Sequence, residues 1–231
     1  MIKLVAFDWN GTIFSDTVAC LESVNQVLKL LSLKSVTLTD FQNHFDVPVV
    51  KTYLGLGIPE DMLNKKAKDI VNVFHSSYEP RATKVRTRAY AKQLLEWLSK
   101  NNIKSIIFSN HIDEPIKKQL KRLKIEKYFS EIIANSELNS SFNGRNKHEK
   151  LKNYLAASKL SPDEVLIVGD TIEEIEIGKD IRAIAVALTG GNCSTIRLKE
   201  HQPDYLINSL KEVIGIIRSY QDPNRKNIKK Q

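Results

Sequence analysis

The chain has 231 residues, of which 42% are hydrophobic, and a formal net charge of +8. This composition favours a globular protein that buries a sizeable core, built as one large domain or a domain with an insertion. No stretch approaches the roughly 18 uninterrupted apolar residues of a membrane span, so we expect a cytoplasmic protein without a membrane partner. Cys20 and Cys193 are far apart and lack metal-ligand spacing, which argues against a disulfide framework and a zinc site.

The excess of basic residues is concentrated in two places. Lysines and arginines are dense between residues 84 and 127 and again between 225 and 230. Aromatic residues are not interleaved with them as a surface for stacking bases would require. We therefore favour a solvated helix face and a disordered end over a nucleic-acid interface, and expect the positive field to attract phosphorylated metabolites. A nucleic-acid end-processing enzyme stays an alternative, which a steep salt dependence of binding would support.

The first third of the chain predicts one strand followed by helices. An apolar strand over residues 3–7 leads directly into Asp8. Apolar residues then recur at three- and four-residue steps, which predicts helices. These helices are expected over residues 18–31, 39–45 and 60–78, the second of them capped by Thr39 or Asp40. No strand is indicated between Ser15 and Ala82, so a helical insertion follows the first strand.

The rest of the chain alternates between helices and strands. Helices are expected from residue 87 to the Asn101-Asn102 pair, over residues 116–123 and 147–158, from 173 onwards and over 195–200. Strands are expected over residues 105–109, 131–134, 165–168, 183–188 and 205–207. This alternation favours an α/β protein with a doubly wound, Rossmann-like parallel sheet. We predict a core domain over 1–14 and 85–218, a helical cap domain over 15–84 and a basic tail over 219–231.

Polar residues follow the predicted strands in a fixed order. They are Asp8, Ser109, Lys147 and Asp170, with Glu173 and Glu174 close behind the last. Ligands bind at the carboxyl ends of the strands in an open α/β sheet. Phosphoryl transfer requires a nucleophile, a cation beside the phosphate, hydrogen-bond donors and usually Mg²⁺, which prefers carboxylates and water. This set could supply each part.

The order and context of these residues resemble the four motifs of the haloacid dehalogenase-like superfamily. The matching segments are Asp8-Trp9-Asn10-Gly11-Thr12, Ile106-Ile107-Phe108-Ser109-Asn110, Lys147 and Gly169-Asp170-Thr171-Ile172-Glu173-Glu174. The resemblance extends from about Lys3 to Leu188. It implies a Mg²⁺-dependent phosphatase that acts on a small phosphorylated metabolite through an aspartyl-phosphate intermediate, similar to the phosphoglycolate phosphatase-like members. The oligomeric state is left open.

The resemblance also implies a role for each matching residue. Asp8 corresponds to the nucleophile and a metal ligand, and the backbone carbonyl of Asn10 to a second metal ligand. Asp170 corresponds to a third metal ligand, and Glu174 takes the place of a further aspartate that binds the ion directly or through water. The implied phosphate-binding residues are Thr12, Ser109, Asn110 and Lys147.

Asn10 departs from the family pattern, because phosphatases of this family have an acid/base aspartate at this position. An amide cannot exchange the protons of general acid–base catalysis, which is commonly worth 10²–10⁴-fold. Several alternatives follow: a slow phosphatase, one specialised for good leaving groups, or one that takes its acid from elsewhere, for example His111. A binding protein without turnover is another alternative.

Two further alternatives come from other branches of the family. With Trp9 after Asp8, the first motif resembles the Asp-Trp-Ala-Gly-Thr motif of the phosphonatases. These enzymes cleave a carbon–phosphorus bond and use a cap lysine to form a Schiff base with the substrate. Candidate lysines are Lys51, Lys65, Lys66 and Lys68. The dehalogenases also lack the second aspartate, but they need no metal, whereas Asp170, Glu173 and Glu174 indicate one here.

Overall fold

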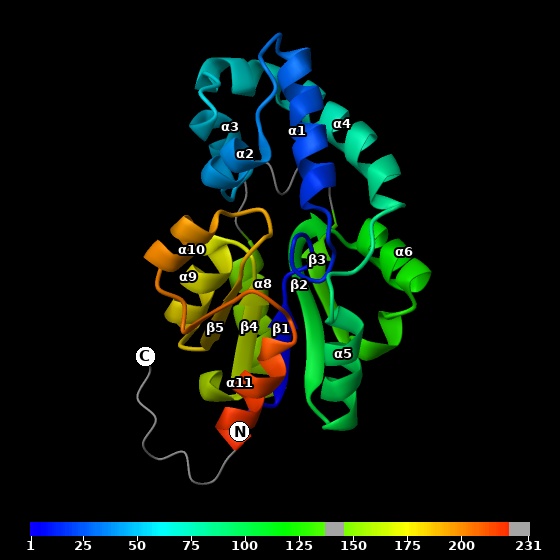
Figure 1. Cartoon of the computed structure of the whole chain (residues 1–231), viewed down its shortest axis with the longest axis vertical. Helices are drawn as coiled ribbons and strands as arrows, with labels where there is room; N and C mark the ends of the chain where they lie inside the picture. Colours follow the sequence, from blue (N-terminus) through cyan, green and yellow to red (C-terminus); the bar gives the residue numbers. More distant parts are fainter. Residues whose placement is uncertain (137–145, 222–231) are drawn as a thin grey trace.

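A six-stranded parallel sheet forms the centre of the molecule, in the order β3-β2-β1-β4-β5-β6 (Figure 1). The computed structural model describes residues 1–136 and 146–221. The strands are β1 (Leu4–Phe7), β2 (Lys104–Ile112), β3 (Glu131–Asn135), β4 (Val165–Gly169), β5 (Ile184–Leu188) and β6 (Tyr205–Ile207). Every residue of β1, β4 and β5 is buried, as expected for parallel strands that are covered on both faces. The predicted α/β class and parallel sheet are confirmed.

Helices pack on both faces of the sheet, which makes it doubly wound. One face is covered by α5 (Ala91–Lys100), α6 (Asp113–Leu123) and α11 (Glu212–Gln221). The other is covered by α8 (Lys147–Ser158) and α9 (Ile172–Ile181), and α10 (Thr195–Glu200) packs beside α9. Alternate residues of β1 point to opposite faces, so Val5 joins the first core and Ala6 the second. Short 3₁₀ turns lie at Glu126–Tyr128 and Pro162–Glu164.

The sheet creates a natural binding crevice where β1 lies beside β4. Phe7 pairs with Val168, so the residues that follow the two strands emerge together. The chain builds the sheet outward from β1 in one direction through β2 and β3, and in the other through β4, β5 and β6. A reversal of this kind leaves a crevice outside the carboxyl ends of the central strands. Asp8 and Asp170 directly follow β1 and β4, so both lie at the base of that crevice.

Four helices, which we call the cap helices, lie beyond the carboxyl edge of the sheet (Figure 1). They are α1 (Thr17–Leu30), α2 (Leu38–His44), α3 (Val50–Gly55) and α4 (Glu60–Ala82). The long helices α1 and α4 pack together through apolar residues that include Val24, Val27 and Ile70. All four lie within the predicted insertion over 15–84, and their status as a separate domain stays a prediction.

Two neighbouring segments connect the cap helices to the sheet. The Ser15 amide donates to the Arg86 carbonyl at 3.0 Å, and the Arg88 amide donates to the Ile13 carbonyl at 2.9 Å. Phe14 and Thr87 form an antiparallel bridge between these two bonds. The chain therefore leaves the core and returns to it through a pair of strand-like segments held side by side.

The structure differs from the sequence prediction at several places. Helix α5 begins at Ala91 rather than at Thr87, which instead forms the bridge with Phe14. Helix α3 replaces part of a stretch whose glycines indicated irregular structure, and α11 was not among the predicted elements. The cap of α2 is Thr37 rather than Thr39 or Asp40; Asp40 instead completes a reciprocal capping box with Thr37.

The predicted tail begins inside a helix, because α11 continues to Gln221. Residues 222–231 of that tail lie outside the described residues. Within the described ranges, none of the helices is both long enough and apolar enough to cross a membrane.

Candidate active site

A buried lysine joins two carboxylates at the carboxyl end of the sheet. Asp8 directly follows β1, and Lys147 is the first residue of α8. The Lys147 Nζ atom lies 2.6 Å from Asp8 Oδ1 and also donates to Glu174 Oε1 near the start of α9. All three side chains are buried. The structure therefore brings together the predicted nucleophile, the predicted lysine and one predicted metal ligand.

Negative charge exceeds positive charge around this lysine. Burial raises the pKa of Asp8 well above its usual range; Lys147 opposes the shift, while Glu174 and Asp170 add to it. Burial lowers the pKa of Lys147, but the attraction of Asp8 and Glu174 outweighs burial and the net shift is upward. Burial also raises the pKa of Asp170 to about 7, with a further contribution from Glu174. A bound cation would favour the ionised form of these carboxyl groups.

Asp170 is held in place by two neighbouring loops. Its Oδ1 atom accepts a hydrogen bond from the Thr12 hydroxyl at 2.6 Å, and its Oδ2 atom accepts one from the Asn192 amide at 2.6 Å. Gly11 has a φ of +73°, and a Cβ atom there would lie 2.2 Å from Asp170 Oδ2. The loop after β1 can therefore approach this carboxylate only with glycine at position 11. Thr12, predicted to bind phosphate, gives its hydroxyl proton to Asp170 in this arrangement.

The donor set around Asp8 and Asp170 fits Mg²⁺. This ion is bound through one or two carboxylates, with other oxygens, water and substrate phosphate completing an octahedron. Asp8, Asp170 and the Asn10 carbonyl belong to adjacent segments at the end of the central strands. In residues 1–136 and 146–221, no three His, Cys, Asp or Glu side chains are grouped as a metal site. Two carboxylates and a backbone carbonyl suit an ion that requires few side-chain ligands.

Glu174 has hydrogen-bond partners on both carboxylate oxygens. Besides the Lys147 contact at Oε1, its Oε2 atom accepts from the Thr171 amide at 3.0 Å and from the Thr171 hydroxyl at 2.6 Å. Thr171 and Glu174 form the capping box of α9, so the carboxylate also satisfies a helix terminus. The structure thus places Glu174 as a partner of Lys147, and its role as a metal ligand stays a prediction.

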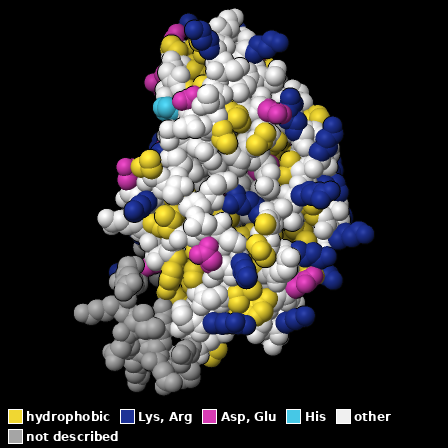
Figure 2. All heavy atoms as spheres, viewed as in Figure 1, with side chains coloured by type: hydrophobic (Ala, Val, Ile, Leu, Met, Phe, Trp, Pro, Cys, Tyr) yellow, Lys and Arg dark blue, Asp and Glu magenta, His cyan; other side chains and the backbone are white. Residues whose placement is uncertain are grey.

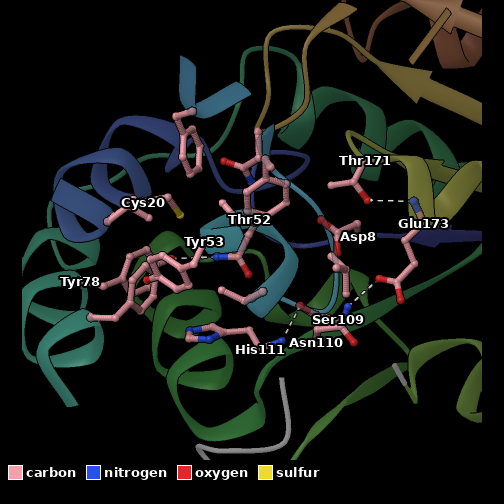
Figure 3. A pocket seen from close by; sticks show the side chains of 18 of the residues that line it. Asp8, Cys20, Thr52, Tyr53, Tyr78, Ser109, Asn110, His111, Thr171 and Glu173 are labelled. Atoms are coloured by element: carbon pink, nitrogen blue, oxygen red, sulfur yellow. Dashed lines mark hydrogen bonds between the residues drawn. The ribbon is translucent and has the colours of Figure 1, made fainter. Parts of the chain in front are cut away.

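Ser109 and Asn110 extend the site along β2. The Ser109 side chain is buried, lines the pocket above Asp8 and accepts a hydrogen bond from the His111 amide at 3.1 Å. The Asn110 amide group donates to Glu173 Oε2 at 2.6 Å, and the pair lies beside Asp8 (Figure 3). The Ser109 hydroxyl proton can therefore be donated into the pocket, where a phosphoryl group on Asp8 would lie.

Asn10 links the loop after β1 to the cap helices. Its Nδ2 atom donates to Asp16 Oδ2 at 2.6 Å and to the hydroxyl oxygen of Tyr78, on α4, at 2.8 Å. The Tyr78 hydroxyl in turn donates to Asp16 Oδ2, and the Gly11 amide donates to Asp16 Oδ1 at 2.7 Å. Burial raises the pKa of Asp16, an effect that these hydrogen bonds oppose. The amide of Asn10 is therefore used to hold a buried carboxylate and a cap tyrosine.

His111 lies where β2 meets the cap helices. Its ring stacks at 6.1 Å on that of His75 and meets the Tyr78 ring edge-on at 5.6 Å. Burial lowers the pKa of His111 to about 4; Glu79 opposes this shift and His75 adds to it. The imidazole is therefore neutral at pH 7, and little of it is in the protonated form that an acid catalyst needs.

Three important residues were not singled out by the sequence. Asp16 and Tyr78 hold Asn10, and Asn192 holds Asp170. Asp16 lies just before the first predicted helix, and Asn192 follows a glycine pair after a predicted strand. Both positions lie in loops next to predicted elements, and this could have identified the two residues as candidates. Tyr78 is 68 residues from Asn10, and no local pattern connects the two.

The basic residues do not form a single continuous patch on the face in view. Figure 2 shows Lys and Arg side chains spread over this face and along one edge, interspersed with acidic and hydrophobic side chains. On α6, for example, Lys117 contacts Asp113 at 2.7 Å and Glu114 at 3.3 Å. A nucleic-acid partner stays an untested alternative.

Replacing Lys147 by Met should destabilise the protein more at pH 8 than at pH 5. Removing one partner of a buried ion pair costs about 3–5 kcal/mol. The folded-state pKa of Asp8 then lies further above its unfolded value, so the unfolded chain releases its proton first and stability falls as the pH rises. Denaturant unfolding at both pH values measures the difference. The exposed Lys152→Met serves as the control. A loss of stability independent of pH would contradict this account.

Known proteins resemble this chain over most of its length. The model of the haloacid dehalogenase-like hydrolases matches residues 5–187. The phosphoglycolate phosphatase of Aquifex aeolicus is 26% identical over 227 residues, which are 95% of this chain and 98% of the relative. The pyrophosphatase PpaX of Listeria monocytogenes is 22% identical over 227 residues, which are 94% of this chain and 97% of the relative.

A solved structure shows the same fold. A haloacid dehalogenase-like family hydrolase from Streptococcus pneumoniae matches with a TM-score of 0.78 at 20% identity, covering 94% of this chain and 98% of that one. The family model spans the sheet from β1 to β5 and with it every residue of the site described above except Asn192. The chain therefore belongs to the haloacid dehalogenase-like hydrolase family.

Proposed function

We propose that this hydrolase is a Mg²⁺-dependent phosphatase that acts on a small phosphorylated metabolite through an aspartyl-phosphate on Asp8. The observation that carries the proposal is the buried contact of Asp8 with Lys147 at 2.6 Å, at the end of the central strand. A carboxylate beside a fixed cation is suited to attack on phosphorus. The relatives named phosphoglycolate phosphatase and pyrophosphatase support the same reaction class.

In the first step, an Asp8 oxygen attacks phosphorus and the bond from phosphorus to the leaving-group oxygen breaks. The phosphoryl group is then held on Asp8, and the electron pair of the broken bond stays with the leaving oxygen. Lys147 neutralises charge on Asp8 and on the phosphoryl oxygens, while the Ser109 hydroxyl donates to one of those oxygens. When bound by Asp8, Asp170 and the Asn10 carbonyl, Mg²⁺ supplies charge stabilisation for the approach of two anions.

In the second step, water attacks phosphorus and the bond to Asp8 breaks, which releases inorganic phosphate and restores the carboxylate. Both steps move a proton, to the leaving group first and from the water second. The Asn10 amide does not ionise, and its donor protons are engaged by Asp16 and Tyr78. The site therefore favours leaving groups that depart without a proton.

The cap lysines give no support to a carbon–phosphorus hydrolase. A lysine that forms a Schiff base with substrate must reach into the pocket. Lys51, Lys65, Lys66 and Lys68 are all exposed, and none of them lines the pocket above Asp8. The second candidate is instead a phosphate-binding protein without turnover, which the amide at position 10 favours.

Replacing Asp8 by Asn should abolish phosphate release, because the reaction requires a carboxylate nucleophile and an amide of the same shape preserves the packing. Release of inorganic phosphate from a panel of phosphorylated metabolites measures this effect, and thermal unfolding reports whether the fold is retained. The exposed Asp163→Asn is the matched control and should leave both unchanged. Turnover at the wild-type rate in Asp8→Asn would remove Asp8 from the mechanism; no turnover by the wild type would favour the binding protein.

Chelation of divalent cations should reduce phosphate release to the background rate, because the ion offsets repulsion between the carboxylates and the substrate. Asp170→Ala should have the same effect in saturating Mg²⁺. Recovery of the wild type on adding back Mg²⁺ or Mn²⁺ would also identify the ion used. Activity that persists after thorough chelation would favour the metal-independent, dehalogenase-like alternative.

Replacing Asn10 by Asp should raise turnover of alkyl phosphates by about tenfold or more and that of aryl phosphates less, since only the former need a proton donor in the first step. The new carboxyl group would face Asp16 at the site of a 2.6 Å contact, which favours sharing of a proton between the two groups. Rates on both substrate classes at saturating Mg²⁺ separate proton donation from metal binding. Equal or lower rates on both classes would show that position 10 does not limit the reaction.

A further inference from the structure

The cap helices build an apolar half onto the pocket above Asp8. The lining side chains of these helices and of the segment between α2 and α3 are largely aliphatic or aromatic and include Val24, Phe45, Val49, Tyr53, Val71 and Phe74. Figure 3 shows the division: Cys20, Tyr53 and Tyr78 lie on one side of the pocket, and Asp8, Thr171 and Glu173 on the other. A molecule that spans both halves carries an anionic group at one end and an apolar group at the other.

Among the described residues, lysine and arginine line this pocket only at its phosphoryl end, and the other basic side chains that line it are His75 and His111. Among the described residues that line it, Lys147 is the single lysine or arginine, and it already contacts Asp8 and Glu174. The neutral His111 adds no charge at pH 7. A second anionic group on the substrate, such as the carboxylate of phosphoglycolate or the second phosphate of pyrophosphate, would be buried against apolar side chains. Burial of a charge without a partner is strongly unfavourable.

The apolar half has a fixed aromatic wall. The ring of Phe74 stacks on that of Tyr78, with centroids 5.6 Å apart and planes 10° apart, and Tyr78 meets His111 edge-on. The Tyr78 hydroxyl is anchored on Asp16, so the side chain cannot swing away from the pocket without losing that bond. Aromatic rings gain additional stabilisation from offset-stacked and edge-to-face contacts with other rings. An aryl group therefore fits this wall better than an alkyl group of similar size.

On these observations we propose that the substrate is an aryl phosphate monoester whose leaving group is uncharged. This proposal rests on the phosphatase function proposed above and narrows its substrate class. An independent observation agrees with it: a phenolate leaves without protonation more readily than an alkoxide, so it suits a site with an amide at position 10. The substrates named for the relatives carry a second negative charge, for which the described cap residues that line the pocket offer no lysine or arginine.

Binding of non-hydrolysable phosphonates tests the proposal without relying on turnover. Benzylphosphonate, methylphosphonate and phosphonoacetate share the phosphonate group and differ in an aryl, a small and an anionic substituent. Calorimetric titration of the wild-type protein in Mg²⁺ should give an affinity for benzylphosphonate about tenfold or more above the other two, because the ring is removed from water. Equal affinity for methylphosphonate and benzylphosphonate, or tightest binding of phosphonoacetate, would overturn the proposal.

Variants of the cap helices assign the preference to this pocket. Phe74→Ala should lower the affinity for benzylphosphonate and leave methylphosphonate unchanged. Val49→Lys, at a half-buried lining position, should raise the affinity for phosphonoacetate about tenfold and weaken that for benzylphosphonate. The matched control is Leu54→Lys, at an exposed cap position outside the pocket lining, which should change none of the three affinities. Equal effects of the two lysine variants would place the aryl group elsewhere.

The outcomes also separate this proposal from the function on which it rests. Phosphate release from acetyl phosphate, which has no aryl group, reports the phosphatase reaction alone. If acetyl phosphate is hydrolysed and benzylphosphonate shows no advantage, the aryl preference fails and the phosphatase stands. If benzylphosphonate binds best and no phosphate is released from any substrate, the aryl site stands and catalysis fails. If none of the phosphonates binds and acetyl phosphate is not hydrolysed, both are overturned.

Discussion

The contact of Lys147 with Asp8 and Glu174 is the constraint on which the rest of the site depends. The carboxylates of Asp8 and Glu174 are buried at the end of the central strand, and burying a charge there without a partner would cost free energy. The lysine that offsets this cost begins α8, and one of its partners caps α9. The same contact therefore offsets the buried charge and joins β1, α8 and α9. Because Asp170 adds further negative charge, the arrangement also favours a cation beside it.

Asn10 shows how a change of one chemical group redirects a site. An aspartate at this position would face Asp16 as a second negative charge, whereas the amide donates to Asp16 and to Tyr78 and so holds both. These partners come from the start of the cap helices and from α4. In the proposed phosphatase, position 10 thus contributes to the attachment of the cap helices, and the leaving group must supply the reactivity that a proton donor would otherwise provide.

The strands and the centre of the site could be predicted from the sequence because their signals are local. Short apolar runs ending in Asp8 or Asp170 are sufficient to place both residues at one edge of a parallel sheet. Contacts set by the packing of the cap helices could not be predicted in this way. Tyr78 reaches Asn10 because α4 packs beyond the carboxyl edge of the sheet, and the two oxygens of Glu174 are shared between a lysine and a helix terminus. Helix α11 was missed although Val213, Ile216 and Ile217 form a regular apolar stripe.

The paired segments around Phe14 and Thr87 have a consequence for how such a protein can change over evolutionary time. Since the two ends of the insertion are hydrogen-bonded neighbours, a tight turn could join them, and closing so short a loop costs little entropy. The sheet with its charged residues therefore does not depend on the length of the segment inserted there. Exchange of the whole insertion between relatives would change the pocket wall and with it the choice of substrate. The residues of the sheet that bind the phosphoryl group would be kept, and only the bonds of Asn10 to Asp16 and Tyr78 would be lost.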